Sequence, residues 1–367
     1  MSGVLEGYRV LEFGDYIASQ MLGMLLADQG AEVVKVEPPE GSTLRGDAPF
    51  AVWNRSKKSI VVDAASDDVS ETIARLAASA DILVSDGEAL PYGAYVSDIQ
   101  SNNPRLISVC LPAFGSEHPN VALPPHETLV AAATGIYATR GTDGSTGEGA
   151  PSYIAVPHAS IFDAITAAPA VIAALLHREA TGEGQRIDLP MYDAMFGAMG
   201  AQAVVLPPDA DDAKPHPAVA RFYECSDGRW VNINAGYPRA LIPMVQAFGH
   251  PEWAEPLLDT DSLRAHPEDR RLWIDALEAI WRSRPALEWE QVMDDAGVPC
   301  TMCRTVDEWL ATEQSSAMGA VTQIDDAALG TMRQVGIQVH LDESEGEIRH
   351  HAPALGEHTD EILAELQ

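Results

Sequence analysis

The sequence predicts an α/β protein with a large domain, built on a doubly wound parallel sheet, and a smaller α+β domain. Three observations carry this prediction. Short runs rich in Val and Ile recur through the first 112 residues, helical segments separate these runs, and a Pro- and Asp-rich stretch divides the later chain. Parallel strands need crossover connections, and the intervening helices are long enough to supply them.

The N-terminal residues read strand, helix, strand. The β-rich run YRVLEF (8–13) is followed by a helical segment over 19–29, and the Val-rich run AEVVKVE (31–37) ends before two prolines. The same alternation continues in the segments SIVVD, ETIARLAASA, DILVS and RLISVCL. Because these apolar strands have no polar face, we expect helices on both faces of the sheet.

A long Ala-rich helix lies in the second half of the large domain. It ends at Thr181 and Gly182, where glycine is a common helix terminator, and the strand RIDL follows it. Residues 206–217 then shift in composition to Pro, Asp and Ala. We interpret this stretch as a linker.

The residues after the linker predict a smaller domain. Asp227-Gly228, flanked by aromatic and β-branched residues, is a strong signal for a β-hairpin, and helical segments follow it. The final residues form an amphipathic helix with Thr359 as its predicted N-cap. We therefore expect a large domain over 1–205, a linker over 206–217, a small domain over 218–330, and a C-terminal segment over 331–367 that returns to the large domain.

The charge of the chain excludes two classes of partner. Lys and Arg number 23 against 55 Asp and Glu, which gives a formal net charge of −32. Such a field repels nucleic-acid phosphates and anionic lipids, so we expect neither nucleic acid nor membrane as a partner. The N-terminal residues lack the pattern of a signal peptide, and four cysteines are too few for a disulfide scaffold. We expect a cytoplasmic protein.

Cys300 and Cys303 form a Cys-x-x-Cys motif, which invites a zinc or redox interpretation. A zinc site would need a second close pair, whereas Cys110 and Cys225 are isolated in the sequence. A thioredoxin-like pair would open a helix, whereas this pair follows Val-Pro and continues as a strand. We therefore favour apolar packing for the motif and expect no metal site.

A cluster of cations, NRSKKS (54–59), stands at the start of a predicted strand. Because the chain has only 23 cations, this cluster makes a local positive spot of the size of a phosphate. Asn54, Arg55 and Lys57 are thus candidate phosphate contacts. A solvated turn is the alternative.

Two further segments carry candidate catalytic residues. His126-Glu127 places an imidazole and a carboxylate at the start of a predicted helix, although neighbouring residues on a helix point apart. His158 and Ser160 stand at the start of the long Ala-rich helix, whose first N–H groups favour an oxyanion or a carboxylate. Ser160 is first of all a candidate N-cap, and as a nucleophile it would need a base such as His126 or His158.

Several long segments, in order, resemble the class III CoA-transferases of the formyl-CoA and carnitine type, a family that includes α-methylacyl-CoA racemase. These segments are LEGYRVLEF, LLADQGAEVVKVEPPEG, NRSKKSIVVD, NPRLISV, VIAALLHREATGEGQRIDLPMYDA and APALGEHTDEIL. The resemblance implies a dimer of interlocked rings, acyl-CoA as substrate rather than a tightly bound cofactor, and a carboxylic acid acceptor. It also implies that Asn54, Arg55 and Lys57 anchor CoA, while Glu127 orients the acyl or acid substrate.

The chain departs from the family at its central residue. The family's V-P-x-A-D segment, whose aspartate attacks the thioester, reads Val-Pro-His-Ala-Ser here and ends at Ser160. The racemase branch pairs a histidine with that aspartate, and His126-Glu127 matches its His-Asp pair. An acidic stretch, residues 85–88, also stands where the family has a basic loop.

Three hypotheses follow from these departures. The first is an acyl-CoA enzyme, of transferase or racemase type, that uses His126, Glu127, His158 and Ser160. The second is a non-catalytic subunit that pairs with an active paralogue in a heterodimer. The third is a binding protein that uses the same cleft for another ligand.

Overall fold

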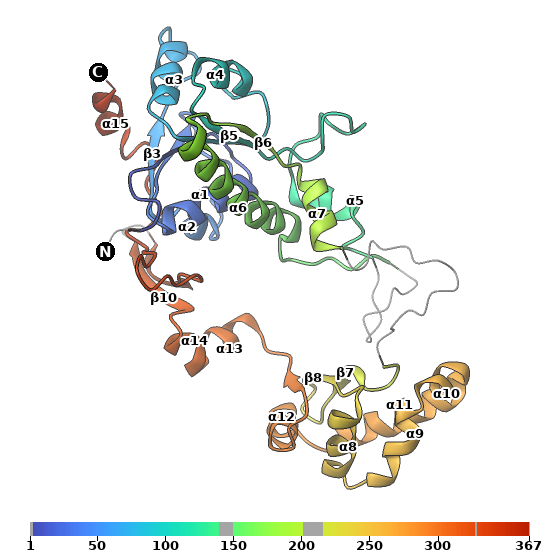
Figure 1. The fold of residues 1–367 in the computed structure, drawn as a ribbon. Helices are drawn as coiled ribbons and strands as arrows, with labels where there is room; N and C mark the ends of the chain where they lie inside the picture. Colours follow the sequence, from blue (N-terminus) through green and yellow to red (C-terminus); the bar gives the residue numbers. More distant parts are fainter. Residues whose placement is uncertain (1–2, 139–149, 201–215, 327–328, 367) are drawn as a thin grey trace. The chain divides into compact units, whose positions relative to one another are not determined.

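The computed structural model describes residues 3–138, 150–200, 216–326 and 329–366. The chain divides into two compact units, and Figure 1 labels most of their helices and strands. The first unit comprises Met1–Ile136, Ile154–Val204 and Thr312–Gln367, and the second comprises Tyr137–Tyr153 and Val205–Ala311.

A six-stranded sheet forms the centre of the first unit, and all its neighbouring strands are parallel. Its strands are β1 (Arg9–Glu12), β2 (Glu32–Glu37), β3 (Lys57–Val61), β4 (Ile82–Ser85), β5 (Ile107–Cys110) and β6 (Arg186–Asp188), in the spatial order β3-β2-β1-β4-β5-β6. The chain runs outward in opposite directions from β1 and from β4, so a topological switch point lies between them. The predicted doubly wound sheet is confirmed.

Helices cover both faces of this sheet. Along β1, Val10 packs in a core with α1 and α6, whereas the next residue, Leu11, packs in a core with α3, α4 and α15 on the other face. This alternation follows from the two-residue period of a strand. The helices of this unit are α1 (Ile17–Asp28), α2 (Phe50–Trp53), α3 (Val69–Ala78), α4 (Val96–Asn102), α5 (Glu127–Ala133), α6 (His158–Thr181), α7 (Met191–Ala198), α14 (Glu313–Ala317) and α15 (Thr359–Glu365).

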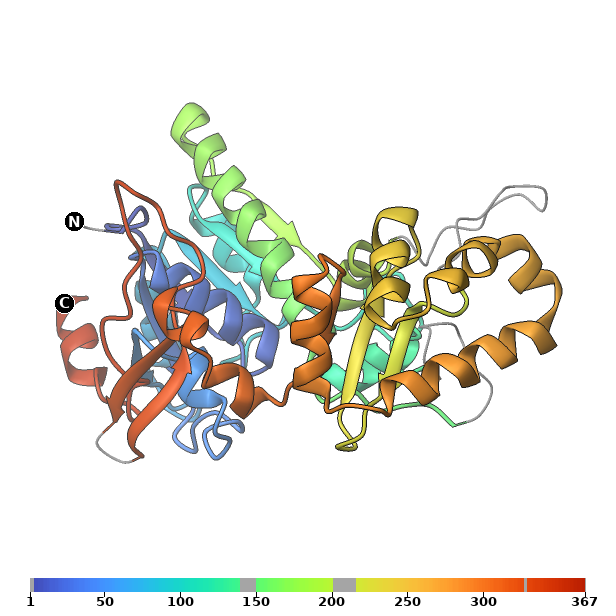
Figure 2. The ribbon, with the colours of Figure 1, turned by 90° about the horizontal axis from the view of Figure 1, so that it is seen from below.

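Helix α6 is the long Ala-rich helix, and it lies beside α1 along the sheet (Figure 2). Its buried face carries the small residues Ala164, Ala167 and Ala174, so the helix packs close to the strands. It ends as predicted at Gly182, whose φ of 83° suits a residue without a Cβ atom. Within the described part of the chain, α6 is also the one helix long and apolar enough to cross a membrane by length and composition.

The second unit is α+β and has its own core around Trp281 and Trp289. Its antiparallel sheet contains β7 (Ala220–Glu224), β8 (Trp230–Asn234) and β9 (Cys300–Met302), and its helices are α8 (Pro238–Ala247), the 3-10 turn η1 (Pro251–Trp253), α9 (Ala254–Leu258), α10 (Thr260–Ala265), α11 (Pro267–Trp281), α12 (Ala286–Asp295) and α13 (Val306–Leu310). The predicted hairpin joins β7 to β8, with Gly228 at a positive φ of 73°. Cys300 lies on β9, as the sequence predicts for a strand.

The chain returns to the first unit at Thr312, whereas the sequence analysis placed the return at residue 331. The hairpin of β10 (Val321–Asp326) and β11 (Gly330–Val335) therefore belongs to the first unit. The buried Arg55 guanidinium binds the carbonyl oxygens of Val335 and, at 3.3 Å, Gly336. Most of the predicted linker, residues 206–215, lies outside the described residues.

Thr359 is the first residue of α15 rather than its N-cap, and His358 holds the N-cap position. The Thr359 hydroxyl instead accepts a hydrogen bond from the backbone N–H of Val61 at 3.0 Å and donates one to the Gly356 carbonyl at 2.9 Å. The side chain thus joins α15 to the edge strand β3, and the helix begins one residue earlier than a Thr359 cap would allow.

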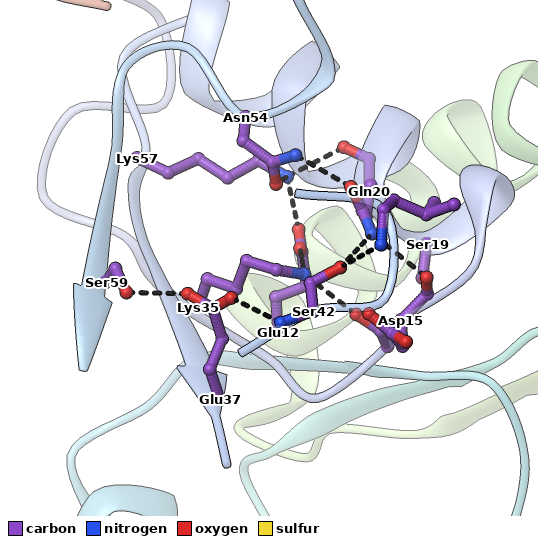
Figure 3. A network of polar contacts seen from close by, with 12 residues as sticks. Glu12, Asp15, Ser19, Gln20, Lys35, Glu37, Ser42, Asn54, Lys57 and Ser59 are labelled. Carbon is purple, nitrogen blue, oxygen red and sulfur yellow. Dashed lines mark hydrogen bonds and ion pairs between the residues drawn. The ribbon is translucent and has the colours of Figure 1, made fainter. Parts of the chain in front are cut away.

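A buried polar network joins the first three strands to α1 (Figure 3). The Glu12 carboxylate lies 3.0 Å from the Lys35 ammonium and 2.6 Å from the Lys57 ammonium, and all three side chains are buried. Asn54 connects Lys57, at 3.1 Å, to Gln20 on α1, at 2.7 Å. Buried charges are stable only when they are paired, so this network constrains how α1 packs on the sheet.

Gly23 on α1 gives this network its space, and we predict that Gly23→Ala destabilises the protein. An alanine Cβ would lie 1.9 Å from a carboxylate oxygen of Glu12 and 2.9 Å from the Lys57 ammonium. We expect a loss of about 1–3 kcal/mol in the free energy of unfolding, measured by urea titration. Gly46→Ala is the control, because nothing lies within 4 Å of its added Cβ. Equal stability of the two variants would contradict the prediction.

Candidate active site

The start of α6 brings together two residues that the sequence analysis singled out. The Glu127 carboxylate accepts hydrogen bonds from the N–H groups of Ala159 at 3.1 Å and Ser160 at 2.8 Å, and from the Ser160 hydroxyl at 2.7 Å. The first N–H groups of a helix have no acceptor within it, so a carboxylate from another element is favoured there. Glu127 and Ser160 thus form one site although 33 positions separate them.

The local geometry of α5 separates His126 from Glu127. His126 is the N-cap of α5, and its Nδ1 accepts a hydrogen bond from the Thr128 N–H at 3.3 Å. Glu127 is the first residue of the helix and points toward α6 instead. His126 is exposed, whereas Glu127 is half-buried. The acidic member of the predicted pair is therefore the one that accepts hydrogen bonds from Ser160.

Ser160 was a candidate N-cap of α6, but it does not hold that position. Pro157 holds that position and the helix begins at His158, which makes Ser160 its third residue, with 1% of its surface exposed. The His158 ring nitrogen lies 2.9 Å from the Val156 carbonyl oxygen. The side chain that contacts the Ser160 hydroxyl is thus Glu127, rather than either of the candidate bases His126 and His158.

Asp163, one turn further along α6, is a feature that the sequence analysis missed. Its side chain is fully buried, and neither carboxyl oxygen has a hydrogen-bond partner among the described residues. Burial, together with the charge of Asp86, raises the pKa of Asp163 well above its usual range. The signal available in the sequence was an acid within the apolar first half of the helix, three positions after Ser160.

Asp86 directly follows β4, one of the two strands at the switch point. Its carboxylate accepts hydrogen bonds from the Ser19 hydroxyl at 2.7 Å and from the backbone N–H groups of Asp15 and Tyr16. It therefore occupies the N-terminus of α1, where the helix dipole favours negative charge. Burial nevertheless raises the pKa of Asp86 to about 6. The charge of Asp86 also contributes to the raised pKa of Asp163 on α6.

Comparisons with known proteins decide the family. The family model described as CoA-transferase family III matches residues 5–359. The chain belongs to CoA-transferase family III. It is 28% identical to the succinyl-CoA–D-citramalate CoA-transferase of Chloroflexus aurantiacus, over 99% of this chain and 94% of that protein. It is 30% identical to the probable fatty acyl-CoA transferase Rv3272 of Mycobacterium tuberculosis, over 82% of each chain.

Solved structures of the family share the fold. A crystal structure of Rv3272 from M. tuberculosis matches with a TM-score of 0.82 and 26% identity, over 98% of both chains. A CaiB/BaiF family protein from Brucella suis matches with a TM-score of 0.84 and 24% identity, over the whole of both chains. The sequence-based recognition of the family is therefore confirmed.

The three residues expected to anchor CoA in this family III member are inside the fold. Asn54, Arg55 and Lys57 are each 0% exposed. Arg55 pairs with Asp28 at 2.6 Å, and burial lowers the pKa of Lys57 to about 8. Side chains without exposed surface do not contact a phosphate, so we remove these residues from the direct CoA contacts. Both cations are instead paired with buried carboxylates, Arg55 with Asp28 and Lys57 with Glu12.

The neighbouring acidic stretch of the CoA-transferase is also accounted for by internal contacts. Asp86 points at α1, as described above, and Glu88 forms an ion pair with Arg186. Neither acid is left as an isolated charge against an anionic ligand.

The cysteines of the family III chain are not arranged as a redox or metal site among the described residues. All four cysteines are free, and burial raises the pKa of Cys300 to about 12, which disfavours the reactive thiolate. Among the described residues, no cluster of three or more His, Cys, Asp or Glu side chains is arranged to hold a metal ion.

The buried Asp163 predicts a pH-dependent effect of Asp163→Asn. A carboxyl whose folded-state pKa is raised contributes stability at low pH, and this contribution is lost as the pH rises through that pKa. Asparagine does not ionise, so the variant should gain stability relative to the wild-type CoA-transferase as the pH rises above about 4, the usual pKa of an aspartate. Urea titrations across this range measure the difference. The exposed Asp67→Asn variant is the control, and a difference for Asp163→Asn that does not change with pH would contradict the prediction.

Proposed function

We propose that this protein transfers CoA from an acyl-CoA thioester to a carboxylic acid, and that the reaction takes place at the start of α6. The observation that carries the proposal is the Glu127 carboxylate held by the hydroxyl and N–H groups of the first turn of α6. The named relatives support the reaction class, since they include a succinyl-CoA–D-citramalate and a succinate–glutarate CoA-transferase.

The chemistry of CoA transfer fits the groups at this position. A thioester carbonyl carbon is an electrophile, and a carboxylate is a suitable nucleophile for exchange between a thioester and an acid. Negative charge then develops on the carbonyl oxygen, and donors at a helix N-terminus stabilise such charge. Ser160 stands where the family resemblance places the aspartate, and the carboxylate that contacts Ser160 is that of Glu127, from α5.

We propose that the NRSKKS cluster acts on CoA binding only through the fold. Asn54 holds Gln20, and the Gln20 amide donates to the Asp15 carbonyl at 3.0 Å and to the Ser42 hydroxyl at 3.3 Å. Asp15 lies in the loop after β1, at the switch point where ligands of doubly wound sheets bind. The network therefore supports the shape of that loop rather than presenting charge to a ligand.

We further propose that the protein is a cytoplasmic dimer of two copies of this chain. The exposed side of α6 carries apolar residues, of which Leu176 is 69% exposed and Ile165 42% exposed. Together with Val4, Ile337 and Val339 they line an apolar groove of about 720 Å³ in the first unit. A second copy that covers this groove would remove apolar surface from water, as the interlocked dimer expected from the family resemblance requires.

A non-catalytic subunit is the second candidate function. The serine at position 160 favours it, because a hydroxyl is a poorer nucleophile than a carboxylate unless a base activates it. One relative of this chain, 27% identical over 99% of it, is named as the alpha subunit of a succinyl-CoA–L-malate CoA-transferase. In this case the chain would transfer CoA only after it assembles with an active paralogue.

The proposal predicts CoA transfer by the purified chain and a weaker reaction in the Ser160→Ala variant. The wild type is incubated with succinyl-CoA and a panel of mono- and dicarboxylates, and new acyl-CoA products are identified by mass spectrometry. Loss of the Ser160 hydroxyl should lower kcat about tenfold, because one of the hydrogen bonds that position the Glu127 carboxylate is lost. The exposed Ser101→Ala variant is the control.

The same experiment separates the two candidate functions when the oligomeric state is measured alongside. Transfer by a homodimer supports the proposed function. No transfer by the homodimer, with transfer restored by a co-purified paralogue, supports the subunit function instead. An unchanged kcat in Ser160→Ala would contradict the assignment of the reaction to the start of α6.

A further inference from the structure

We infer that Glu127 is the nucleophile of this protein, and that a carboxylate from α5 takes the place of the aspartate which the family carries at position 160. The inference rests on the proposed function and deepens it. It concerns which atom of this chain forms the covalent bond to the acyl group.

The distances place the Glu127 carboxylate where the missing group would be. In serine and aspartate alike, a single γ atom follows Cβ, so the carboxyl carbon of an aspartate at position 160 would stand near the Ser160 Oγ. Glu127 Oε2 lies 2.7 Å from this Oγ and 2.8 Å from the Ser160 backbone nitrogen. The longer glutamate side chain thus brings a carboxylate from a separate helix to the same turn of α6.

Accessibility distinguishes Glu127 from the other acid on this part of α6. Asp163 is fully buried and lies one turn further into the helix, while Ser160 is 1% exposed. Glu127 as a residue is only half-buried. Because Glu127 is the least buried of these three residues, we infer that its carboxylate is the one that an incoming thioester reaches.

The hydrogen bonds leave one oxygen of Glu127 available for attack. Oε2 accepts two hydrogen bonds, from the Ser160 hydroxyl and the Ser160 N–H, whereas the described contact of Oε1 is a longer bond from the Ala159 N–H, at 3.1 Å. A carboxylate has about four lone-pair sites on its two oxygens. We therefore assign Oε1 as the attacking atom and Oε2 as the oxygen that holds the carboxylate in place.

The first half of the reaction balances without an oxidant or a proton donor. Oε1 forms a bond to the acyl carbon, the carbon–sulfur bond breaks, and the electron pair leaves on sulfur as CoA thiolate. This gives an anhydride between the donor acid and Glu127. The thiolate then attacks the Glu127 carbonyl carbon, which releases the donor acid as a carboxylate and leaves CoA joined to Glu127 as a thioester.

The second half reverses these steps with the acceptor acid. The acceptor carboxylate attacks the Glu127 thioester and expels the CoA thiolate, which gives an anhydride between the acceptor and Glu127. The thiolate attacks the acceptor carbonyl carbon of this anhydride. The new acyl-CoA leaves and the Glu127 carboxylate is restored. The N–H groups at the start of the 24-residue helix α6 lie beside every oxyanion that forms on Glu127.

The inference is tested with Glu127→Gln and with the double variant Glu127→Gln/Ser160→Asp. Glutamine keeps a carbonyl oxygen for the N–H groups of α6 but has no nucleophilic carboxylate. We expect Glu127→Gln to lower kcat about 10³-fold with little change in the KM of the acyl-CoA. The double variant returns a carboxylate to position 160 and should recover at least about tenfold of that loss. Glu6→Gln, an exposed acid in the same unit, is the control and should keep the wild-type kcat.

A covalent readout on the wild type is independent of how well the variants fold. Hydroxylamine added during turnover traps a glutamyl anhydride or thioester as a hydroxamate, which peptide mass spectrometry locates. We expect the hydroxamate at Glu127, and only when acyl-CoA is present. Thermal unfolding of each variant accompanies the kinetics, so that loss of fold is recognised as such.

The outcomes separate this inference from the proposed function. A wild type that transfers CoA, together with an equally active Glu127→Gln variant or with a hydroxamate on a residue other than Glu127, overturns the inference and leaves the function standing. A folded wild-type homodimer that transfers no CoA between any donor and acceptor overturns the proposed function, and the inference falls with it. A hydroxamate at Glu127 together with the loss of kcat in Glu127→Gln supports both.

Discussion

The first turn of α6 needs hydrogen-bond acceptors, and the candidate site follows from how the fold supplies them. The N–H groups of Ala159 and Ser160 have no partner within their own helix, and Glu127 from α5 accepts hydrogen bonds from both. This contact connects two helices that the chain separates by a long stretch of other residues. A helix terminus that would otherwise bind solvent or an anion thereby acquires a carboxylate of the protein itself.

Buried ion pairs are the second feature on which the first unit depends. The chain has 23 cations against 55 acids, and the two buried cations at the start of β3 are paired with buried carboxylates. Glu12 binds both Lys35 and Lys57, and Arg55 binds Asp28. Charges buried in this way have to be paired, so the network constrains α1 and the loop after β1 rather than offering positive charge to a ligand. The loop nevertheless ends at the switch point, where a doubly wound sheet places its ligands.

Two acids with raised pKa values lie on different elements of the first unit. Asp86 follows β4 and accepts hydrogen bonds from Ser19 of α1 and from the two residues just before that helix, whereas Asp163 lies on the buried face of α6 without a hydrogen-bond partner among the described residues. Burial raises the pKa of both carboxyls. In contrast, Glu127 on α5 lies at the start of α6, half-buried and bound by three donors. The three carboxyl groups thus occupy different environments, and such differences are how a site assigns separate roles to similar groups.

The sequence by itself determined the elements and the class of the fold. Val-rich runs and the glycine after the long helix predicted the strands of the sheet and the end of α6, because the two-residue and 3.6-residue periods and the left-handed glycine conformation are local properties. The family was also readable, since its segments are long and occur in order. Local rules likewise placed His126 and Glu127 at the start of a helix.

Only the tertiary structure decided what these residues do. No spacing rule relates Glu127 to Ser160, because the contact depends on how α5 packs against α6. The NRSKKS cluster had the composition of a phosphate site, yet in the folded chain the Lys57 ammonium binds Glu12 of β1 and the Gln20 carbonyl of α1. Asp163 was inconspicuous in the sequence, and its burial became evident only once α6 was packed on the sheet. Periodicity reports which residues are on one element, whereas partners on separate elements are set by the free energy of packing and of charge pairing.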